Sequence, residues 1–437
     1  MRQALQRGRA RFSDVPWWRR ALYWDGTIGG IYAVIVGGTV QTGVILWAGG
    51  GAFDLGLLSA LTTGGGFIVL AMRYFERRSG SHRNLTRFGW TVARVIWLPL
   101  VVFLVLTTGF GDVGRSLAVP IMLVTVLASA AFGAVGNVAW YSWVARLVPS
   151  AERGAFIAQR SLWTSVASLI LFPIVGWVLD RGTALHHEAF GFASVLVLPV
   201  ISGLVGWRLL SVVPELNAPA PGTNAARRSR RGAIPAGRFA LYNAVWQIAV
   251  YFSAPFFQAY ALERLGFSFT LLMNLQVLGQ VISILTLGWW GQIIDRVGLK
   301  LPLAVCSIGK GLVPIFYIVS THDVWWPVLG AYIFTVLDAG IGTATGTAFA
   351  EISSGRQGSA RVAHLNLLIS ICASVTPLLA GALVARFQTP GVDMLALLFI
   401  VSAVGRALSG VILLIPERRR RLRPHSPALQ SMTGPTG

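Results

Sequence analysis

Long apolar stretches separated by short polar segments make up most of the chain. A helix that crosses a bilayer core of about 30 Å needs about 20 apolar residues, and twelve stretches are close to that length or longer. They cover residues 26–53, 55–72, 88–111, 116–145, 161–179, 189–207, 239–262, 265–294, 301–321, 324–350, 362–385 and 394–416. None alternates apolar and polar positions with the period of two that barrel strands show. The pattern therefore predicts an all-α membrane protein with twelve transmembrane helices.

A polar segment near the middle of the chain divides these stretches into two sets of six. Residues 214–238 are rich in Pro, Ala, Gly and Arg, which is typical of a flexible linker. We expect one six-helix bundle at 25–213 and a second at 239–416, as in a transporter built from two repeats. We also expect an amphipathic cytoplasmic N-terminus at 1–24 and a disordered cytoplasmic tail at 417–437.

The composition supports a chain that is mostly surrounded by lipid. Of its 437 residues, 54% are hydrophobic and 12% are charged, and the mean hydropathy is +0.66. Soluble proteins carry roughly 25% charged residues. The net charge is +20, from 36 Lys and Arg against 16 Asp and Glu. In a soluble protein this excess would suggest a nucleic-acid partner, so the location of the basic residues decides its meaning.

The basic residues predict the orientation of the chain. With both termini in the cytoplasm, four basic residues lie in outer segments and four within spans, and the other 28 of the 36 are cytoplasmic. The outer residues are Arg115, Arg181, Arg264 and Arg386, and those within spans are Arg94, Arg208, Lys310 and Arg406. This asymmetry follows the positive-inside rule. It predicts a multi-pass protein of the plasma (inner) membrane with both termini cytoplasmic, whose partner is the lipid bilayer and not nucleic acid.

A short loop between the eighth and ninth expected spans carries the most specific motif. The sequence GQIIDRVGLK has the form GxxxDRxGxK, with fixed positions at Gly291, Asp295, Arg296, Gly298 and Lys300. A glycine at the first position permits close helix approach, and an aspartate can face the positive end of another helix. With this loop, the chain resembles the major facilitator superfamily, whose inner-loop signature has that form.

Two further loops extend the resemblance. Glu76 and Arg77 match the acidic–basic pair of the same signature in the first half, although the leading glycine is missing and Gly80 is one residue late. Between the fourth and fifth spans, the PxxxRG turn of the superfamily is matched by Pro149, Arg153 and Gly154. We expect these loops to form the gate, with Asp295 and Arg296 contacting the start of the fifth span near Arg153 and Arg160.

The resemblance implies that spans one, four, seven and ten line a central cavity. Polar and aromatic residues on these spans, and on the eighth behind them, are the candidate substrate ligands: Tyr32, Gln41, Asn137, Asn243, Trp246, Gln247, Tyr251, Gln276 and Tyr332. The seventh span is the richest, and four of its polar positions, Gln258 included, fall close to one helical face. Polar side chains between membrane helices can equally serve as hydrogen bonds that hold the helices together.

Asp338 is the candidate coupling residue. It lies roughly 18 Å from either end of the tenth expected span, near the bilayer midplane. A carboxylate at that depth is unfavourable unless it is paired or protonated, which suits a proton-coupling site. The alternative is a structural ion pair with Lys310 or Arg406. We expect Arg94 to be a poorer partner because it lies nearer the cytoplasmic end and can extend to the interface.

These features favour a secondary active transporter that works by alternating access. We expect it to be proton-coupled and monomeric, to move a small molecule and to favour efflux of amphiphilic compounds. The alternatives are an importer of a sugar or other metabolite, and a transporter-shaped sensor or assembly protein. The sequence holds no Walker A loop and no catalytic set, so we expect neither ATP hydrolysis nor an enzyme. Because Cys306 and Cys372 lack metal-ligand spacing, we expect no metal and no cofactor.

Overall fold

The elements of the computed structural model are helices. It describes residues 16–106, 111–215, 234–353, 358–387 and 393–416. Within these ranges every regular element is an α-helix or a 3-10 helix, and none is a strand. Eleven helical stretches in the described ranges are long and apolar enough to cross a membrane. The predicted all-α membrane fold is therefore confirmed. Residues 1–15, 216–233 and 417–437, which hold most of the expected N-terminal segment, linker and tail, lie outside the described residues.

The first half of the chain forms an N-terminal bundle. Its elements are α2 (Trp17–Val36), α3 (Thr39–Trp47), α4 (Ala52–Gly64), η2 (Gly65–Ala71), α5 (Met72–Ser79), α6 (His82–Val95), α7 (Leu98–Leu106), α8 (Gly111–Leu147), α9 (Ser150–Ala184) and α10 (Glu188–Ser211). The first expected span is divided into α2 and α3 at Gly38, whose φ of 101° suits a glycine. Helix α2 also begins earlier than the apolar stretch at Gly26, so Asp25 lies inside a helix.

The second half forms a C-terminal bundle. Its helices are α11 (Ala236–Tyr251), α12 (Phe256–Glu263), α13 (Phe269–Val297), α14 (Lys300–Lys310), α15 (Leu312–Ile318), α16 (Pro327–Ile333), α17 (Thr335–Ser353), α18 (Gly358–Phe387) and α19 (Met394–Leu414). The expected seventh span is divided into α11 and α12 just before Pro255, which has no N–H to continue a helix. Neither piece alone is long enough to span a membrane. A seventh span made of both, and hence a total of twelve, stays a prediction.

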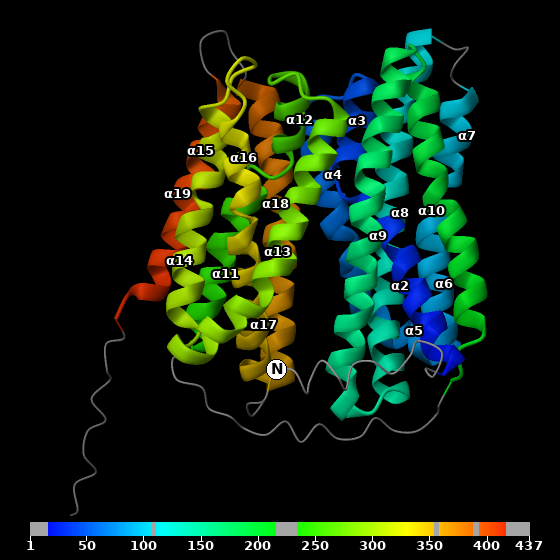
Figure 1. Ribbon diagram of the computed structural model, residues 1–437, viewed down its shortest axis with the longest axis vertical. Helices are drawn as coiled ribbons and strands as arrows, with labels where there is room; N and C mark the ends of the chain where they lie inside the picture. Colours follow the sequence, from blue (N-terminus) through cyan, green and yellow to red (C-terminus); the bar gives the residue numbers. More distant parts are fainter. Residues whose placement is uncertain (1–15, 107–110, 216–233, 354–357, 388–392, 417–437) are drawn as a thin grey trace, which may run out of the picture.

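The two bundles stand side by side (Figure 1). We call the end where α10 stops and α11 starts the linker end, and the opposite end the far end. Helix α4 of the first bundle packs on α18 of the second, and α9 packs on α13. The first of these contacts is close, since a Cβ on Gly56 would lie 2.3 Å from the Pro377 carbonyl oxygen. The ribbons of α9 and α13 are near each other at the far end and diverge toward the linker end (Figure 1).

Candidate functional site

Asp180 joins the two bundles at the far end. It lies near the C-terminal end of α9, and its carboxylate accepts hydrogen bonds from the backbone N–H groups of Phe269 at 2.8 Å and Thr270 at 2.9 Å. Both amides belong to the first turn of α13, where backbone donors have no partner within the helix and the helix dipole favours an anion. Asp180 therefore binds two free amides of a helix in the other bundle, beside the cap that Ser268 provides by accepting from Leu271 N–H.

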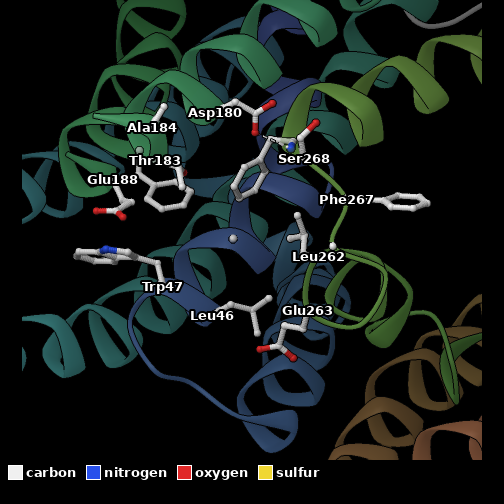
Figure 2. A pocket seen from close by; sticks show the side chains of 14 residues that line it. Leu46, Trp47, Asp180, Thr183, Ala184, Glu188, Leu262, Glu263, Phe267 and Ser268 are labelled. Carbon is white, nitrogen blue, oxygen red and sulfur yellow. Dashed lines mark hydrogen bonds between the residues drawn. The ribbon is translucent and has the colours of Figure 1, made fainter. Parts of the chain in front are cut away.

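A cavity of about 590 Å³ lies beside this contact at the far end, and both bundles line it. Figure 2 shows Asp180 next to Ser268 at its edge, with Trp47 and Glu188 on another side and Glu263 farther away. Although three carboxylates line the cavity, the described residues contain no group of three or more His, Cys, Asp or Glu that could hold a metal ion. The cavity is a vestibule between the bundles at the far end.

Further contacts between the bundles lie deeper. Gln276 donates a hydrogen bond of 2.6 Å to the Thr39 hydroxyl, so this predicted cavity residue links the bundles. Gln280 donates to Ser165 at 3.2 Å. On α13, residues 269, 270, 276 and 280 make these bonds, whereas the helix continues to Val297 at the linker end. The hydrogen bonds described between α13 and the first bundle are thus confined to its first half.

Three cavities follow one another through the molecule. The arginine cavity, about 210 Å³, is lined by Gly29, Tyr32, Trp90, Ala93, Arg94, Gly133, Asn137, Arg160 and Thr164. It shares Tyr32, Gly133 and Asn137 with the middle cavity of about 280 Å³, which reaches Gln41 and Thr63. The middle cavity in turn shares Gln41 and Thr63 with the interbundle cavity of about 320 Å³, which reaches Tyr251 and Gln258 of the second bundle.

The predicted substrate residues divide between these cavities and helix packing. Tyr32, Gln41, Asn137 and Tyr251 line the cavities. The Gln41 Nε2 and Gln258 Oε1 atoms are buried and have no hydrogen-bond partner within the described residues. Both are therefore polar groups that a ligand or water can satisfy.

Four other predicted residues lie elsewhere. Asn243 is buried and donates to the Phe239 carbonyl of its own helix at 2.8 Å. Trp246 stacks on Tyr242, with ring centroids 6.3 Å apart. Gln247 is half-buried on the same helix, and Tyr332 is buried among core residues. These four residues are not among those described as lining the three cavities. Asn243 and Tyr332 thus serve packing in this conformation.

A cluster of three charges is buried in the N-terminal bundle. Asp25 is completely buried, and its Oδ2 accepts a hydrogen bond of 2.9 Å from Arg160. Arg94 approaches the other carboxylate oxygen at 3.8 Å and donates to the Ser202 carbonyl at 3.3 Å. The expectation that Arg94 extends to the membrane interface is wrong, because the residue is only 5% exposed. The buried Asp25 gives it a partner, so extension is unnecessary.

Aromatic rings surround the two arginines of this cluster. The Arg160 guanidinium carbon lies 4.6 Å from the Trp140 ring centroid and 5.4 Å from that of Trp90. Arg94 lies 5.7 Å from both Trp90 and Tyr32. These are cation–π distances, which stabilise positive charge where water is scarce. The Trp90 indole also donates to Asn137 Oδ1 at 3.0 Å, which orients that amide.

A second cluster of three charges lies in the C-terminal bundle. Lys310 donates to Asp338 at 2.8 Å. The Asp338 side chain is 48% exposed, whereas that of Lys310 is 10% exposed. Arg406 is buried, donating to Ser253 at 3.1 Å and to the Lys310 carbonyl at 3.4 Å. The structure thus forms one of the two expected ion pairs of Asp338, and this pair leaves the carboxylate partly open.

The signature loop lies at the linker end. Gly298 follows α13 with a φ of 88°, which suits a glycine, and Lys300 begins α14. A Cβ on Gly291 would meet nothing within 4 Å, so close approach at this glycine is not used in this conformation. In the first half, Glu76 and Arg77 lie on α5, which Gly80 terminates with a φ of 62°.

The expected partners of Asp295 and Arg296 are bound within their own bundle. Arg153 donates to the carbonyls of Ala145 and Val148 at the end of α8, at 2.6 and 3.3 Å. Arg160 donates to Asp25. Pro149 precedes α9, and Gly154 has open space around it. The gating contact of Asp295 and Arg296 with this region stays a prediction for a different conformation.

Comparisons with known proteins were made for the sequence and for the structure. No family model matches the chain, and no curated protein is found to match its sequence. Solved structures do match. The xylose transporter XylE from E. coli, in an inward open conformation, aligns with a TM-score of 0.67 at 13% identity and covers 92% of this chain and 98% of its own. A bacterial homologue of the iron transporter ferroportin, in an inward-facing state, gives 0.70 at 14% identity, covering 91% and 98%.

A third solved structure, the nucleoside transporter NupG, gives a TM-score of 0.60 at 10% identity and covers 92% of this chain and 99% of its own. The fold is the major facilitator fold. At these identities the likeness shows the fold, and not the substrate. The chain is accordingly a multi-pass membrane protein with the architecture of known transporters.

Each bundle carries a buried cation in the last turn of a helix, Arg94 in α6 and Lys310 in α14. Sequence reasoning singled out Lys310 but missed the role of Arg94, together with Asp25 and Asp180. The signal for Asp25 was present: a carboxylate next to an apolar stretch that contains no other charge. Asp25 precedes the first residue of that stretch, Gly26, and so was not among the candidate residues.

Proposed function

We propose that this protein is a secondary active transporter that moves a small molecule across the plasma membrane by alternating access. The linker end faces the cytoplasm and the far end faces outward, in accordance with the positive-inside distribution. The observation that carries the proposal is the arrangement of the polar cavities. They run from inside one bundle to the interface with the other, while the hydrogen bonds from α13 to the first bundle lie in the outward half of that helix.

In this proposal, the present conformation is closed outward and the opposite state requires the outer contacts to break. Asp180 would release the first turn of α13, and Gln276 would release Thr39. The loop of Asp295 and Arg296 would then approach the start of α9 at the linker end. The two bundles move largely as rigid bodies in transporters with repeated halves.

Distances between spin labels test this cycle without a known substrate. Cys306 and Cys372 are first replaced by alanine. Labels on the exposed residues Leu185 and Trp326 then report on the far end, and labels at Gly154 and Val297 report on the linker end. We expect two populations at each end, with the far-end distance increasing in the molecules whose linker-end distance decreases. A single population at both ends under every condition would contradict alternating access.

Asp338 is proposed to couple transport to protons. Its carboxylate is half-exposed while its partner Lys310 is nearly buried, and this exposure supports proton access to the carboxylate. Protonation would remove the negative charge that holds Lys310 and would free the tenth span to move. The alternative is an ion pair that serves only to hold α14 against α17.

Vesicle experiments separate these two roles. With a substrate identified by thermal-shift screening of drug, sugar, amino-acid and metabolite panels, Asp338→Asn should abolish transport driven by a pH gradient and leave substrate exchange intact. Full gradient-driven transport by the variant would remove Asp338 from coupling. An unstable variant would indicate the structural ion pair. We propose export of amphiphilic compounds as the direction, and inverted and right-side-out vesicles distinguish export from import.

A further inference from the structure

The three central cavities carry an excess of positive charge. Arg94 and Arg160 are the charged residues among those described as lining them, and no lining residue is acidic. Asp25, buried behind the arginine cavity, compensates one of the two charges. A net positive charge at this depth is unfavourable unless something neutralises it. The cluster is therefore one negative charge short of balance.

The same two arginines have unused hydrogen-bond donors. The Arg160 Nε has no hydrogen-bond partner within the described residues, but it is buried beside Gly26, so Arg160 contributes charge to the cavity rather than this donor. Arg94 uses only its Nη1 atom, for Ser202, while its Nη2 lies on the side of the cavity-lining Gly29, 3.6 Å from where a Cβ would be. Asn137 adds another donor, because its Oδ1 is bound to Trp90 and its amide nitrogen makes no described hydrogen bond. These donors suit an acceptor-only group such as a carboxylate.

A purely structural role explains this arrangement less well. One arginine is sufficient to pair with Asp25, and Arg160 does so with a hydrogen bond of 2.9 Å. Arg94 is 3.8 Å from the same carboxylate, beyond hydrogen-bond distance, and Asp25 Oδ1 has no hydrogen-bond partner among the described residues. The second arginine thus adds charge to the cavity without completing the bonding of Asp25.

The walls of the cavity indicate the rest of the ligand. Trp90 and Tyr32 line the cavity, and rings of this kind stack on planar apolar groups. The arginine cavity, at about 210 Å³, is smaller than the roughly 300 Å³ typical of pockets for drug-sized ligands. A bound molecule must be small or extend into the middle cavity past Tyr32 and Gly133.

We propose that the arginine cavity binds a small organic monocarboxylate with a planar ring, and that such anions are the substrate class of this transporter. One negative charge balances the single excess positive charge, the unused donors of Arg94 and Asn137 meet its two oxygens, and Arg160 contributes its charge. This inference rests on the proposed transport function. It disfavours a cationic substrate, which would have to enter a site that is already positive.

Binding to the purified full-length protein in detergent tests the inference. Isothermal titration calorimetry is run with benzoate and with two molecules of similar shape, neutral benzamide and cationic benzylamine. We expect benzoate to bind, benzamide to bind roughly tenfold or more weakly, and benzylamine to give no heat, because hydrogen bonds to a charged acceptor are the stronger ones. Equal binding of benzoate and benzamide, tighter binding of benzylamine, or no binding of benzoate would overturn the proposal.

Variants locate the site. Arg160→Gln removes the excess charge and leaves Asp25 with Arg94, so benzoate affinity should fall tenfold or more. Gly29→Ala narrows the cavity with ordinary van der Waals contact, and should also weaken benzoate binding in a folded protein. Gly288→Ala is the matched control, because a Cβ there meets nothing within 4 Å in the other bundle. Unchanged benzoate affinity in both Arg160→Gln and Gly29→Ala would overturn the assignment.

The outcomes also separate this inference from the proposed transport function. Binding in detergent requires no movement across a membrane. Benzoate binding that depends on Arg160, in a protein whose spin-label distances never change, would support the anion site and contradict transport. Transport of uncharged molecules by a protein that does not bind benzoate would support the transport function and contradict the anion site.

Discussion

The two bundles hold the same charges in different surroundings. Each has two cations and one carboxylate at membrane depth: Asp25 with Arg94 and Arg160 in the first, and Asp338 with Lys310 and Arg406 in the second. In the first bundle the carboxylate is completely buried and Arg160 borders a cavity. In the second the carboxylate is half-exposed and both cations are buried.

This difference in burial suggests a division of roles. Asp25 is completely buried beside two arginines and is suited to hold them in fixed positions. The Asp338 side chain is 48% exposed, which fits the coupling role proposed for it. In the proposed mechanism, the first half therefore holds a binding cluster and the second half holds a switchable cluster. Substitutions that change one carboxylate at a time test this comparison.

The largest effect is expected for Asp25→Ala. It leaves Arg94 and Arg160 buried without a counter-charge, and removing one partner from a buried ion pair destabilises a protein by roughly 3–5 kcal/mol. Asp338→Ala should lower the apparent Tm of the purified protein less, because the Asp338 side chain is 48% exposed and its attraction to Lys310 is more screened than the attractions inside the buried cluster. Thermal denaturation in detergent compares the two variants. Equal losses of Tm would break the distinction between a buried and an accessible cluster.

The sequence was sufficient to predict the helical fold and its division into two halves. Runs of apolar residues report helices directly, because lipid requires the backbone to bond within itself. The linker expected at 214–238 rests on a change of composition and stays a prediction, because most of it lies outside the described residues. The division of α11 from α12 is signalled by Pro255, yet the apolar run continues through it, so hydropathy alone gave one span.

The candidate site was predictable only in part. Tyr32, Gln41 and Asn137 were identifiable as polar positions on the first and fourth spans, whereas the pairing of Asp25 with Arg160 joins residues that are 135 positions apart. Hydropathy does not report such pairings. It also treats a buried arginine and one that reaches the interface alike, which is why Arg94 was misplaced. Asp180 was missed for the same reason, since its partners are backbone amides of the other bundle.

An intermediate effect on stability is expected for Asp180→Ala. Unlike Asp25 and Asp338, Asp180 makes its contacts with the other bundle. The variant loses the two hydrogen bonds to the first turn of α13, and hydrogen bonds to a charged group contribute about 1.5–3 kcal/mol. The spin-label distances at Leu185 and Trp326 should shift toward far-end opening by roughly tenfold or more in population. Asp180→Asn retains one acceptor oxygen and should shift them less. An unchanged distribution in Asp180→Ala would show that this contact does not close the far end.

The smallest effect is expected at an exposed ion pair of the C-terminal bundle, which serves as the reference for the buried ones. Asp393 accepts a hydrogen bond from Arg264, and both side chains are well exposed. Partial burial acts to raise the pKa of Asp393, but the hydrogen bond and charge of Arg264 outweigh it, so the pKa lies below its ordinary value. The pair therefore stabilises the fold above the ordinary pKa of about 4, and this contribution is lost as the pH falls through the lowered value. Exposed pairs contribute at most about 1 kcal/mol.

Asp393→Asn tests this pair, because the asparagine keeps an oxygen that can accept the hydrogen bond from Ala396 N–H and cap α19. Its Tm should be slightly lower than that of the parent protein at neutral pH, and the two values should converge as the pH is lowered toward about 3. High salt at neutral pH should reduce the difference as well, since salt screens exposed charges. A Tm difference that persists at acid pH would assign the effect to the cap of α19. A decrease in Tm as large as that of Asp25→Ala would show that burial does not determine how much each carboxylate stabilises the protein.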